Sequence, residues 1–452
     1  MSEVLDKLVN KFGDKKVKVS DDYFEKYGVD WYKGIKPDPL AIFFPETEED
    51  LIQLVNLASN ESYPIVPSGG RTGLCGGATA TQKEIVISLE RMNKIEWLAD
   101  KQQIKCQAGA ITDDAKALAD ENNRLLPISL SSSSSSSIGG NVATNAAGAK
   151  FIRYGSTKDY VAKMKVILAT GEILELQKEI KKDSTGPNLM EIFFGSEGSL
   201  GIIYEVVLNT CEKPTIREDL VIQTDDIEVI KNEILKPEIK QAISSVEYWD
   251  TNCQNLLGSN PEAKYFVLVQ LASCNAAEID KCLESLAEKE LNISLLNSKQ
   301  AEEAWAKRED LPVILADNNA YKMDICIPIE QLGNFLLKIE EIGQTEIYSF
   351  GHLGDGNIHL NIVSKERELE LIENVYSLLK DFGGSPSAEH GIGQRKKNIW
   401  SDFPEYQSKY LLLQKIKKSL DPKNILSPKV FYRDGLPLQT LYLVVFRTLK
   451  HI

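Results

Sequence analysis

The sequence predicts an α+β protein with more than one domain. At 452 residues the chain exceeds the size of one ordinary domain. Over residues 41–210, short β-branched runs alternate with glycine-rich turns, whereas beyond 214 the strands are followed by longer amphipathic helices. The second pattern is typical of helices that cover an antiparallel sheet. We therefore expect one domain over 1–213, a second over 214–436, and an apolar tail over 437–452.

The individual elements follow from the spacing of apolar residues. Residues 3–12 have helical spacing, and Gly13 ends this helix. Thr170-Gly171 predicts a tight turn between two paired strands. The other strands are predicted over 85–89, 164–169, 172–176, 201–208, 242–248, 265–271 and 322–327. Further helices are predicted over 276–289, 330–341 and 404–420.

Composition excludes several classes of protein. The formal net charge of −14 argues against a nucleic-acid partner, and it requires cations inside the site if the substrate is an anion. No apolar run reaches the ~18 residues of a membrane span, and the first thirty residues lack the pattern of a secretory signal. The seven cysteines include no CxxC pair, so we expect reduced thiols in a cytoplasmic protein. The apolar stretch 438–446 fits a last strand, a membrane-surface contact or a disordered end.

Three glycine-rich segments lie in the first half. The first, residues 67–77, has five glycines within nine residues, so its amides can turn toward an anion without Cβ clashes. It matches neither the P-loop nor the dinucleotide fingerprint, and by itself it fits a flexible turn or a phosphate cradle. Together with 138–148 and 195–201, it indicates a large phosphate-bearing cofactor.

Three of the four histidines fall in two short motifs, of which the first spans residues 351–361. Its Asp-Gly pair at 355–356 predicts a two-residue hairpin turn. This register would place His352 directly opposite His359, with Cβ atoms about 5 Å apart on one face. Asn361 would follow on the same side of the strand.

The second histidine motif, residues 387–393, adds Glu389 beside His390. Two facing imidazoles and one carboxylate make a catalytic type of metal site, in which one coordination position stays open. The alternative is a pair of half-buried histidines without a ligand.

Five motifs resemble those of one flavoenzyme family in their order and spacing. They are GGRTGL at 69–74, IGGNVATN at 138–145, GSEGSLGI at 195–202, GHLGDGNIH at 351–359 and SAEHGIG at 387–393. Over about residues 37–431 the chain resembles the FAD-dependent D-2-hydroxy-acid dehydrogenases (the glycolate oxidase D-subunit, D-lactate dehydrogenase and D-2-hydroxyglutarate dehydrogenase group). This resemblance implies a two-part FAD-binding domain of the vanillyl-alcohol-oxidase type. An α+β substrate (cap) domain with a helix-covered antiparallel sheet, the metal site and a C-terminal helix would follow it.

The resemblance also implies a role for particular residues. The implied cofactor-binding residues are Ser68, Gly69, Gly70, Arg71, Thr72, Gly73, Leu74, Gly139, Gly140, Asn141, Thr144, Asn145, Gly148, Gly201, Ile202 and Ile203. The implied metal ligands are His352, His359 and Glu389. The implied substrate-binding residues are Arg308, Lys322, Asn361 and His390, and His390 is also the implied general base.

Two departures from the family pattern bear on these roles. Residues 131–137 are seven consecutive serines where relatives have a mixed loop of the same length. Their backbone fits a cofactor role, whereas the side-chain contacts of these serines with the cofactor are left open. Pro312 stands at a position where the hydroxyglutarate enzymes of this family share a threonine. This difference weakens the expectation of that particular substrate.

The implied activity is oxidation of a small D-2-hydroxy acid, of the D-lactate or D-2-hydroxyglutarate type, by metal-assisted hydride transfer to flavin. We expect non-covalent FAD and a divalent metal, with zinc first and manganese second. A quinone or an electron-transfer protein would accept the electrons. A weak membrane-surface contact and a homodimer are left open. The alternatives are a flavin oxidase of the same fold acting on glycolate or another alcohol, and a non-catalytic flavoprotein subunit of a larger complex.

Overall fold

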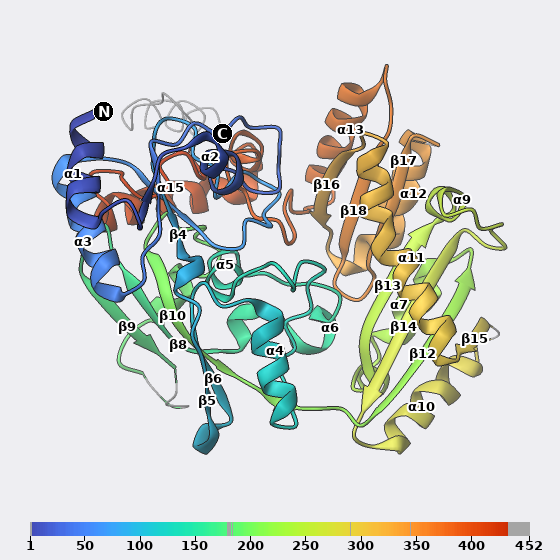
Figure 1. The fold of residues 1–452 in the computed structure, drawn as a ribbon. Helices are drawn as coiled ribbons and strands as arrows, with labels where there is room; N and C mark the ends of the chain where they lie inside the picture. The colour runs from blue at the N-terminus through green and yellow to red at the C-terminus, as the bar shows by residue number, and fades with distance from the viewer. Residues whose placement is uncertain (1, 179–181, 183, 290, 344, 433–452) are drawn as a thin grey trace.

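The computed structural model describes residues 2–178, 182, 184–289, 291–343 and 345–432, and it consists of two halves that lie side by side (Figure 1). The apolar tail, whose role the sequence left open, lies outside these residues. Helix α1 (Ser2–Phe12) ends before Gly13, as predicted. The φ of Gly13 is +75°, a conformation that favours glycine. No helix in the described part of the chain is long and apolar enough to cross a membrane.

Two main sheets form the N-terminal half. The order of the four-stranded sheet is β1-β2-β4-β3, with β2, β4 and β3 parallel, and the order of the antiparallel five-stranded sheet is β5-β6-β10-β8-β9. The strands of this half are β1 (Val17–Lys18), β2 (Ala41–Phe43), β3 (Ile65–Ser68), β4 (Ile85–Ser88), β5 (Ile95–Leu98), β6 (Gln103–Gln107), β7 (Arg124–Leu125), β8 (Val161–Ile167), β9 (Ile173–Gln177), β10 (Ile202–Asn209) and β11 (Cys211–Glu212). Its helices include α2 (Asp21–Tyr27), α3 (Glu48–Glu61), α4 (Thr112–Glu121), α5 (Ile138–Thr144) and α6 (Phe151–Tyr154). The predicted hairpin at Gly171 is present between β8 and β9.

One antiparallel sheet of seven strands forms the other half, in the order β15-β12-β14-β13-β17-β18-β16. Its strands are β12 (Ile216–Thr224), β13 (Ile243–Asp250), β14 (Tyr265–Ser273), β15 (Asn292–Leu296), β16 (Tyr321–Cys326), β17 (Ile347–His352) and β18 (Asn357–Ile362). The helices of this half are α7 (Ile227–Ile234), α8 (Pro237–Lys240), α9 (Thr251–Leu256), α10 (Ala276–Ala287), α11 (Ser298–Asp317), α12 (Leu332–Gly343) and α13 (Glu368–Asp381). The predicted antiparallel sheet with covering helices is confirmed, and each predicted strand and helix coincides with an element of the structure to within a few residues.

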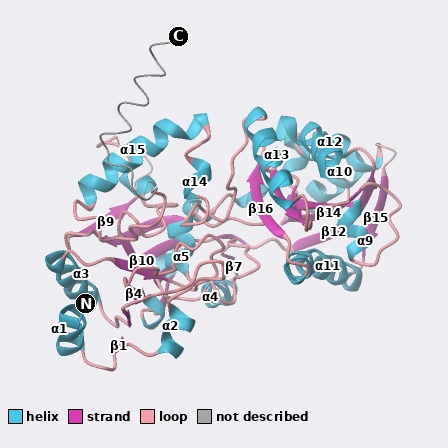
Figure 2. Cartoon of the chain, turned by 90° about the horizontal axis from the view of Figure 1, so that it is seen from above, coloured by secondary structure: helices cyan, strands magenta, loops and turns pink. Residues whose placement is uncertain are grey.

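The two faces of this sheet differ because side chains alternate along each strand. On one face apolar side chains such as Val246, Ile325 and Leu360 form the core with α10, α12 and α13. Figure 2 shows these three helices on one side of the sheet and α11 on the other. The face toward α11 carries the polar residues of the candidate site.

The chain returns to the N-terminal half over its last described residues. After α14 (Lys397–Trp400), helix α15 (Pro404–Leu420) lies over that half, although it follows the seven-stranded sheet in sequence (Figures 1 and 2). Leu426 forms a parallel bridge with Ile65 of β3. The ammonium of Lys417 donates to the carbonyl of Ser199 at 2.8 Å and lies 2.6 Å from the carboxylate of Asp421. The C-terminal segment thus packs into the core of the first half.

Candidate active site

A row of polar side chains crosses four neighbouring strands on the face toward α11. Strand pairing places Glu247 opposite His352, and it places Lys322 opposite Asn361. On the same two strands, two residues away from the Lys322–Asn361 pair, Asp324 lies opposite His359. Because alternate residues of a strand point the same way, these six side chains share one face.

The predicted hairpin register is wrong, although the hairpin itself is present. His352 pairs with Asn357 and His359 pairs with Phe350, so four residues rather than two connect the strands. The buried Leu353 is drawn out of the ladder because its N–H donates to the carbonyl of Val246 at 2.9 Å. The two histidines are therefore diagonal neighbours on one face, with ring centroids 5.3 Å apart.

The loop 387–393 completes a cluster of metal-ligand type. Each of His352, His359 and Glu389 offers one atom, and these atoms lie within 4.8 Å of one another. His352 Nε2 is 3.2 Å from the Glu389 carboxylate. Two imidazole nitrogens and a carboxylate oxygen at this spacing suit a divalent metal. The ring of His390 stacks against that of His359, with 5.9 Å between centroids.

Glu247 links this cluster to Arg308. One carboxylate oxygen lies 2.5 Å from His352 Nδ1, and the other accepts a hydrogen bond from Arg308 Nε at 2.8 Å. The Arg308 guanidinium also lies over the ring of Phe350, 4.6 Å from its centroid. Burial lowers the pKa of His352, but the carboxylates of Glu247 and Glu389 raise it well above its ordinary value. Glu247 thus fixes one predicted ligand and one predicted substrate-binding cation together.

Asp324 has the same role on the other side of the cluster. Its carboxylate lies 3.6 Å from His359 Nδ1 and 3.5 Å from His390 Nδ1. Burial acts to raise the pKa of Asp324, but His390, Lys396 and His359 hold it below its usual range. A carboxylate on the second nitrogen of a histidine sets the orientation of the ring and frees Nε2 for a metal. Glu247 is hydrogen-bonded to His352 Nδ1, and Asp324 lies at ion-pair distance from His359 Nδ1, so each histidine of the cluster has a carboxylate beside its second nitrogen.

The two predicted substrate cations are not solvated surface charges. Arg308 is buried on α11, and the ammonium of Lys322 donates to the carbonyl of Pro312 at 2.7 Å. Burial lowers the pKa of Lys322, and the nearby Arg395 lowers it further. Asn361 is buried on the same face. The structure therefore brings Asn361 and Lys322 together on paired strands, with Arg308 joined through Glu247.

The glycine-rich segments and the serine run meet in the N-terminal half. The hydroxyl of Ser137 accepts hydrogen bonds from the amides of Gly70 and Gly140, at 3.2 and 3.3 Å. A Cβ on Gly70 would lie 2.1 Å from the carbonyl oxygen of Ser135, so only glycine permits this approach. The serine run thus serves the first loop through both its backbone and a hydroxyl.

The hydroxyl of Ser68 is a buried oxygen without a hydrogen-bond partner among the described residues, and the hydroxyls of Ser196 and Ser427 share this property. Unpartnered hydroxyls beside a glycine-rich loop fit a polar cofactor, because a bound phosphate or sugar oxygen would supply the partner. Arg71, a predicted cofactor residue, instead lies over the ring of Tyr27 and 3.6 Å from Glu90.

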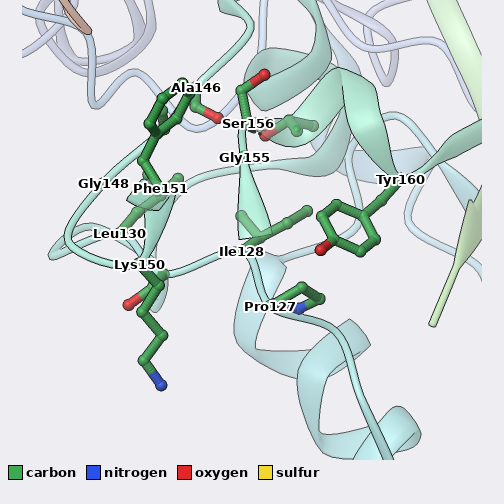
Figure 3. A pocket seen from close by; sticks show the side chains of 13 residues that line it. Pro127, Ile128, Leu130, Ala146, Gly148, Lys150, Phe151, Gly155, Ser156 and Tyr160 are labelled. Carbon is green, nitrogen blue, oxygen red and sulfur yellow. Dashed lines mark hydrogen bonds between the residues drawn. The ribbon is translucent and has the colours of Figure 1, made fainter. Parts of the chain in front are cut away.

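A small pocket is lined by Gly148, at the end of the second glycine-rich segment, and by side chains such as Ile128, Phe151 and Tyr160 (Figure 3). Lys150 extends away from the other labelled side chains in this view. None of the imidazoles or carboxylates of the metal-type cluster lines this pocket, so it is a separate feature.

Sequence reasoning missed Glu247 and Asp324. Each is an acid in a strand that also packs apolar side chains into the core, Glu247 in Ile243–Asp250 and Asp324 in Tyr321–Cys326. An acid in such a strand could have signalled a buried partner, because an unpaired buried charge is too costly to keep.

The fold and the site define a flavoprotein oxidoreductase, and the comparisons with known proteins agree. The sequence matches the FAD binding domain family over residues 39–177 and the C-terminal domain of FAD linked oxidases over 222–430. The chain belongs to the FAD-linked oxidase family, it binds FAD, and its resemblance to the D-2-hydroxy-acid dehydrogenases is confirmed.

Several relatives that match over most of the chain are D-2-hydroxyglutarate dehydrogenases. The D-2-hydroxyglutarate dehydrogenase of Stutzerimonas stutzeri is 30% identical, over 95% of this chain and 98% of the relative. That of Xanthomonas citri pv. viticola is 32% identical, over 91% and 93%. The mitochondrial enzyme of Rattus norvegicus is 31% identical, over 88% and 79%.

Solved structures show the same fold at lower identity. p-Cresol methylhydroxylase aligns with a TM-score of 0.76 at 16% identity, covering 95% of this chain and 96% of that one. Alkyldihydroxyacetonephosphate synthase aligns with a TM-score of 0.75 at 16% identity, covering 95% and 85%. The predicted vanillyl-alcohol-oxidase-type fold is confirmed.

Proposed function

We propose that this flavoenzyme oxidises a D-2-hydroxy acid to the 2-oxo acid, and that a dicarboxylate of the D-2-hydroxyglutarate type is the first substrate to test. The observation that carries the proposal is the convergence of His352, His359 and Glu389 on one point beside Arg308. A site of this kind holds the hydroxyl at a metal and the carboxylate at a cation. The names of the relatives support the choice of acid.

The residues present fit both implied groups. We assign the FAD pyrophosphate to the loop at 68–74, and the rest of FAD to the segments at 139–148 and 201–203. We assign the metal to His352 Nε2, the ring of His359 and Glu389. When bound, FAD supplies the hydride acceptor and the metal supplies a Lewis acid for the substrate hydroxyl.

The protein's own residues then have three tasks. Arg308 and Lys322 hold carboxylate oxygens by charge-assisted hydrogen bonds, and Asn361 fixes the acid beside them. His390 takes the hydroxyl proton as general base, since Asp324 sits 3.5 Å from its Nδ1 and so orients the ring. Removal of this proton would prepare the substrate to give up its α-hydrogen, for which FAD, when bound, would be the acceptor.

Several finer assignments belong to the same proposal. Zinc is the first metal to test and manganese the second, because two imidazoles and a carboxylate suit either ion. The electrons pass to a quinone or an electron-transfer protein. A cytoplasmic location is supported by the absence of CxxC pairs and by the four cysteines buried as free thiols. The homodimer and the membrane-surface contact stay open.

Replacing Arg308 with Ala tests the substrate assignment. A hydrogen bond to a charged group is worth about 1.5–3 kcal/mol, so kcat/KM should fall roughly 10- to 150-fold. Arg308→Lys should not restore activity fully, because an ammonium cannot grip two oxygens as the guanidinium fork does. Initial rates with D-2-hydroxyglutarate and D-lactate, measured by reduction of a dye, would check this.

Lys307→Ala is the matched control, because Lys307 is the exposed neighbour of Arg308 on α11. For a dicarboxylate enzyme, Arg308→Ala and Lys322→Ala should harm D-2-hydroxyglutarate oxidation much more than lactate oxidation. Equal losses with both acids would favour a short monocarboxylate substrate. No loss with any acid that bleaches the flavin would place the substrate pocket elsewhere.

We also expect FAD to be released when acid denatures the protein. Cys75 lies in the first glycine-rich loop, but burial raises the pKa of its thiol to about 12, so it is a poor nucleophile. His352 and His359 belong to the metal-type cluster, and the ring of His390 stacks against that of His359. Acid precipitation and chromatography of the supernatant would measure free FAD, and yellow colour that stays with the precipitated chain would contradict the expectation.

A further inference from the structure

The loop that carries Glu389 and His390 continues directly onto the N-terminal half. The carbonyl of Cys75 accepts the amide of Gln394 at 2.8 Å. The side-chain amide of Gln394 donates to the carbonyls of Gly76 and Thr79, at 2.8 and 2.7 Å. The end of the loop is therefore docked on the glycine-rich cofactor segment rather than on its own sheet.

Glu197 holds the middle of this loop from the cofactor-binding half. One oxygen of its carboxylate accepts the amide of Ile392 at 2.8 Å, and the other accepts the amide of Gly393 at 2.9 Å. The backbone of Glu197 has a φ of 49° and its own N–H donates to the carbonyl of Ala143 at 2.8 Å. A left-handed conformation in a glutamate is uncommon and requires support from its surroundings. Here the support comes from α5, beside the predicted cofactor residues at 144 and 145.

Asp324 holds the start of the same loop from the seven-stranded sheet. Its carboxylate accepts the amides of Glu389 and His390, each at 2.9 Å. Two carboxylates, one from each half of the molecule, thus bind four amides within five residues of the chain. The position of Glu389 and His390 relative to the flavin-binding segments depends on both.

We infer that Glu197 is a positioning residue that sets the distance and orientation of the Glu389–His390 loop relative to the flavin. The expected effect on flavin reduction rests on the proposed function, whereas the contact of Glu197 with the loop does not. A carboxylate offers an acceptor to each of the two amides. A glutamine offers one acceptor and turns an NH2 group toward the other amide, where no hydrogen bond forms.

The test compares Glu197→Gln with the control Glu205→Gln in enzyme loaded with FAD and zinc. Glu205 is also a partly buried glutamate of the N-terminal half, but it pairs with Lys105 and Lys165, away from the loop. Hydrogen exchange of peptides that cover residues 390–396 should become roughly tenfold faster in Glu197→Gln and stay unchanged in the control. In stopped flow with D-2-hydroxyglutarate, flavin reduction should slow roughly tenfold while the Kd of the acid changes less than about threefold.

Unchanged exchange in Glu197→Gln, or faster exchange with an unchanged rate of flavin reduction, would overturn the inference. If Glu197→Gln fails to fold or to bind FAD, the wild-type protein decides the question. Its amides at 392 and 393 should then exchange as slowly as those of β16, and exchange at the rate of an open loop would overturn the inference. If no 2-hydroxy acid bleaches the wild-type flavin, the proposed function fails, whereas the exchange result still decides whether Glu197 holds the loop.

Discussion

His359→Ala should lose turnover almost completely while the protein stays yellow. Metal coordination of the substrate hydroxyl is worth several kcal/mol, so the rate should fall roughly a thousandfold or more. The flavin spectrum should change little, because the cofactor segments lie in the other half of the chain, whereas His359 is on β18. Steady-state rates, metal content and the visible spectrum would be measured on the same preparation.

Chelation of the wild-type enzyme is the control for this variant. A strong chelator should abolish turnover, and added zinc or manganese should restore it in the wild type but not in His359→Ala. Added FAD should rescue neither. Full activity in a verified metal-free sample would refute the metal role.

Glu247→Ala should cause the largest loss of stability among the site variants. It leaves the buried guanidinium of Arg308 and the imidazole of His352 without their shared carboxylate. Breaking a buried ion pair by removing one partner costs about 3–5 kcal/mol. Metal affinity should fall about 10- to 100-fold as well, because His352 loses the carboxylate that orients its ring. Denaturant unfolding and metal titration would measure the two effects.

A second substitution separates charge burial from packing. Arg308→Met in the Glu247→Ala background removes the stranded cation, so part of the lost stability should return, whereas metal affinity should not. Glu309→Ala, at an exposed position of α11, should change neither quantity. If the free energy of unfolding of Glu247→Ala equals that of the wild type, the buried ion pair contributes nothing to the stability of the fold.

The fold was predictable where local pattern decides structure. The helix over residues 3–12 stops at a glycine with positive φ. The continuous apolar run of β14 and the apolar alternation of β16 are both typical of strands. The order of the seven strands was not predictable, because it depends on pairings between segments far apart in the sequence. His352 and His359 could be placed on one face, since both sit near a single turn.

The register of that turn was not predictable, and the reason is tertiary. An Asp-Gly pair favours a two-residue turn, but the contact of Leu353 with Val246 on a neighbouring strand lengthens the loop. Glu247 was missed for a similar reason, because its partners come from β17 and α11 and no local pattern brings them together. The residues of the candidate cluster were therefore readable from the sequence, whereas the carboxylates beside its histidines were not.

The return of the C-terminal segment to the first half has a consequence for synthesis on the ribosome. The ammonium of Lys423 donates to the carbonyl of Ser59, a partner 364 positions earlier in the chain, and Leu426 bridges Ile65. The buried side chains of Ile425 and Leu426 belong to the same apolar cluster as Phe43 and Leu54. The first half cannot close this cluster until the last segment has been translated, although most of its own residues leave the ribosome first. During that interval all seven strands of the second half are already available, so we expect this half to complete its core before the first half does.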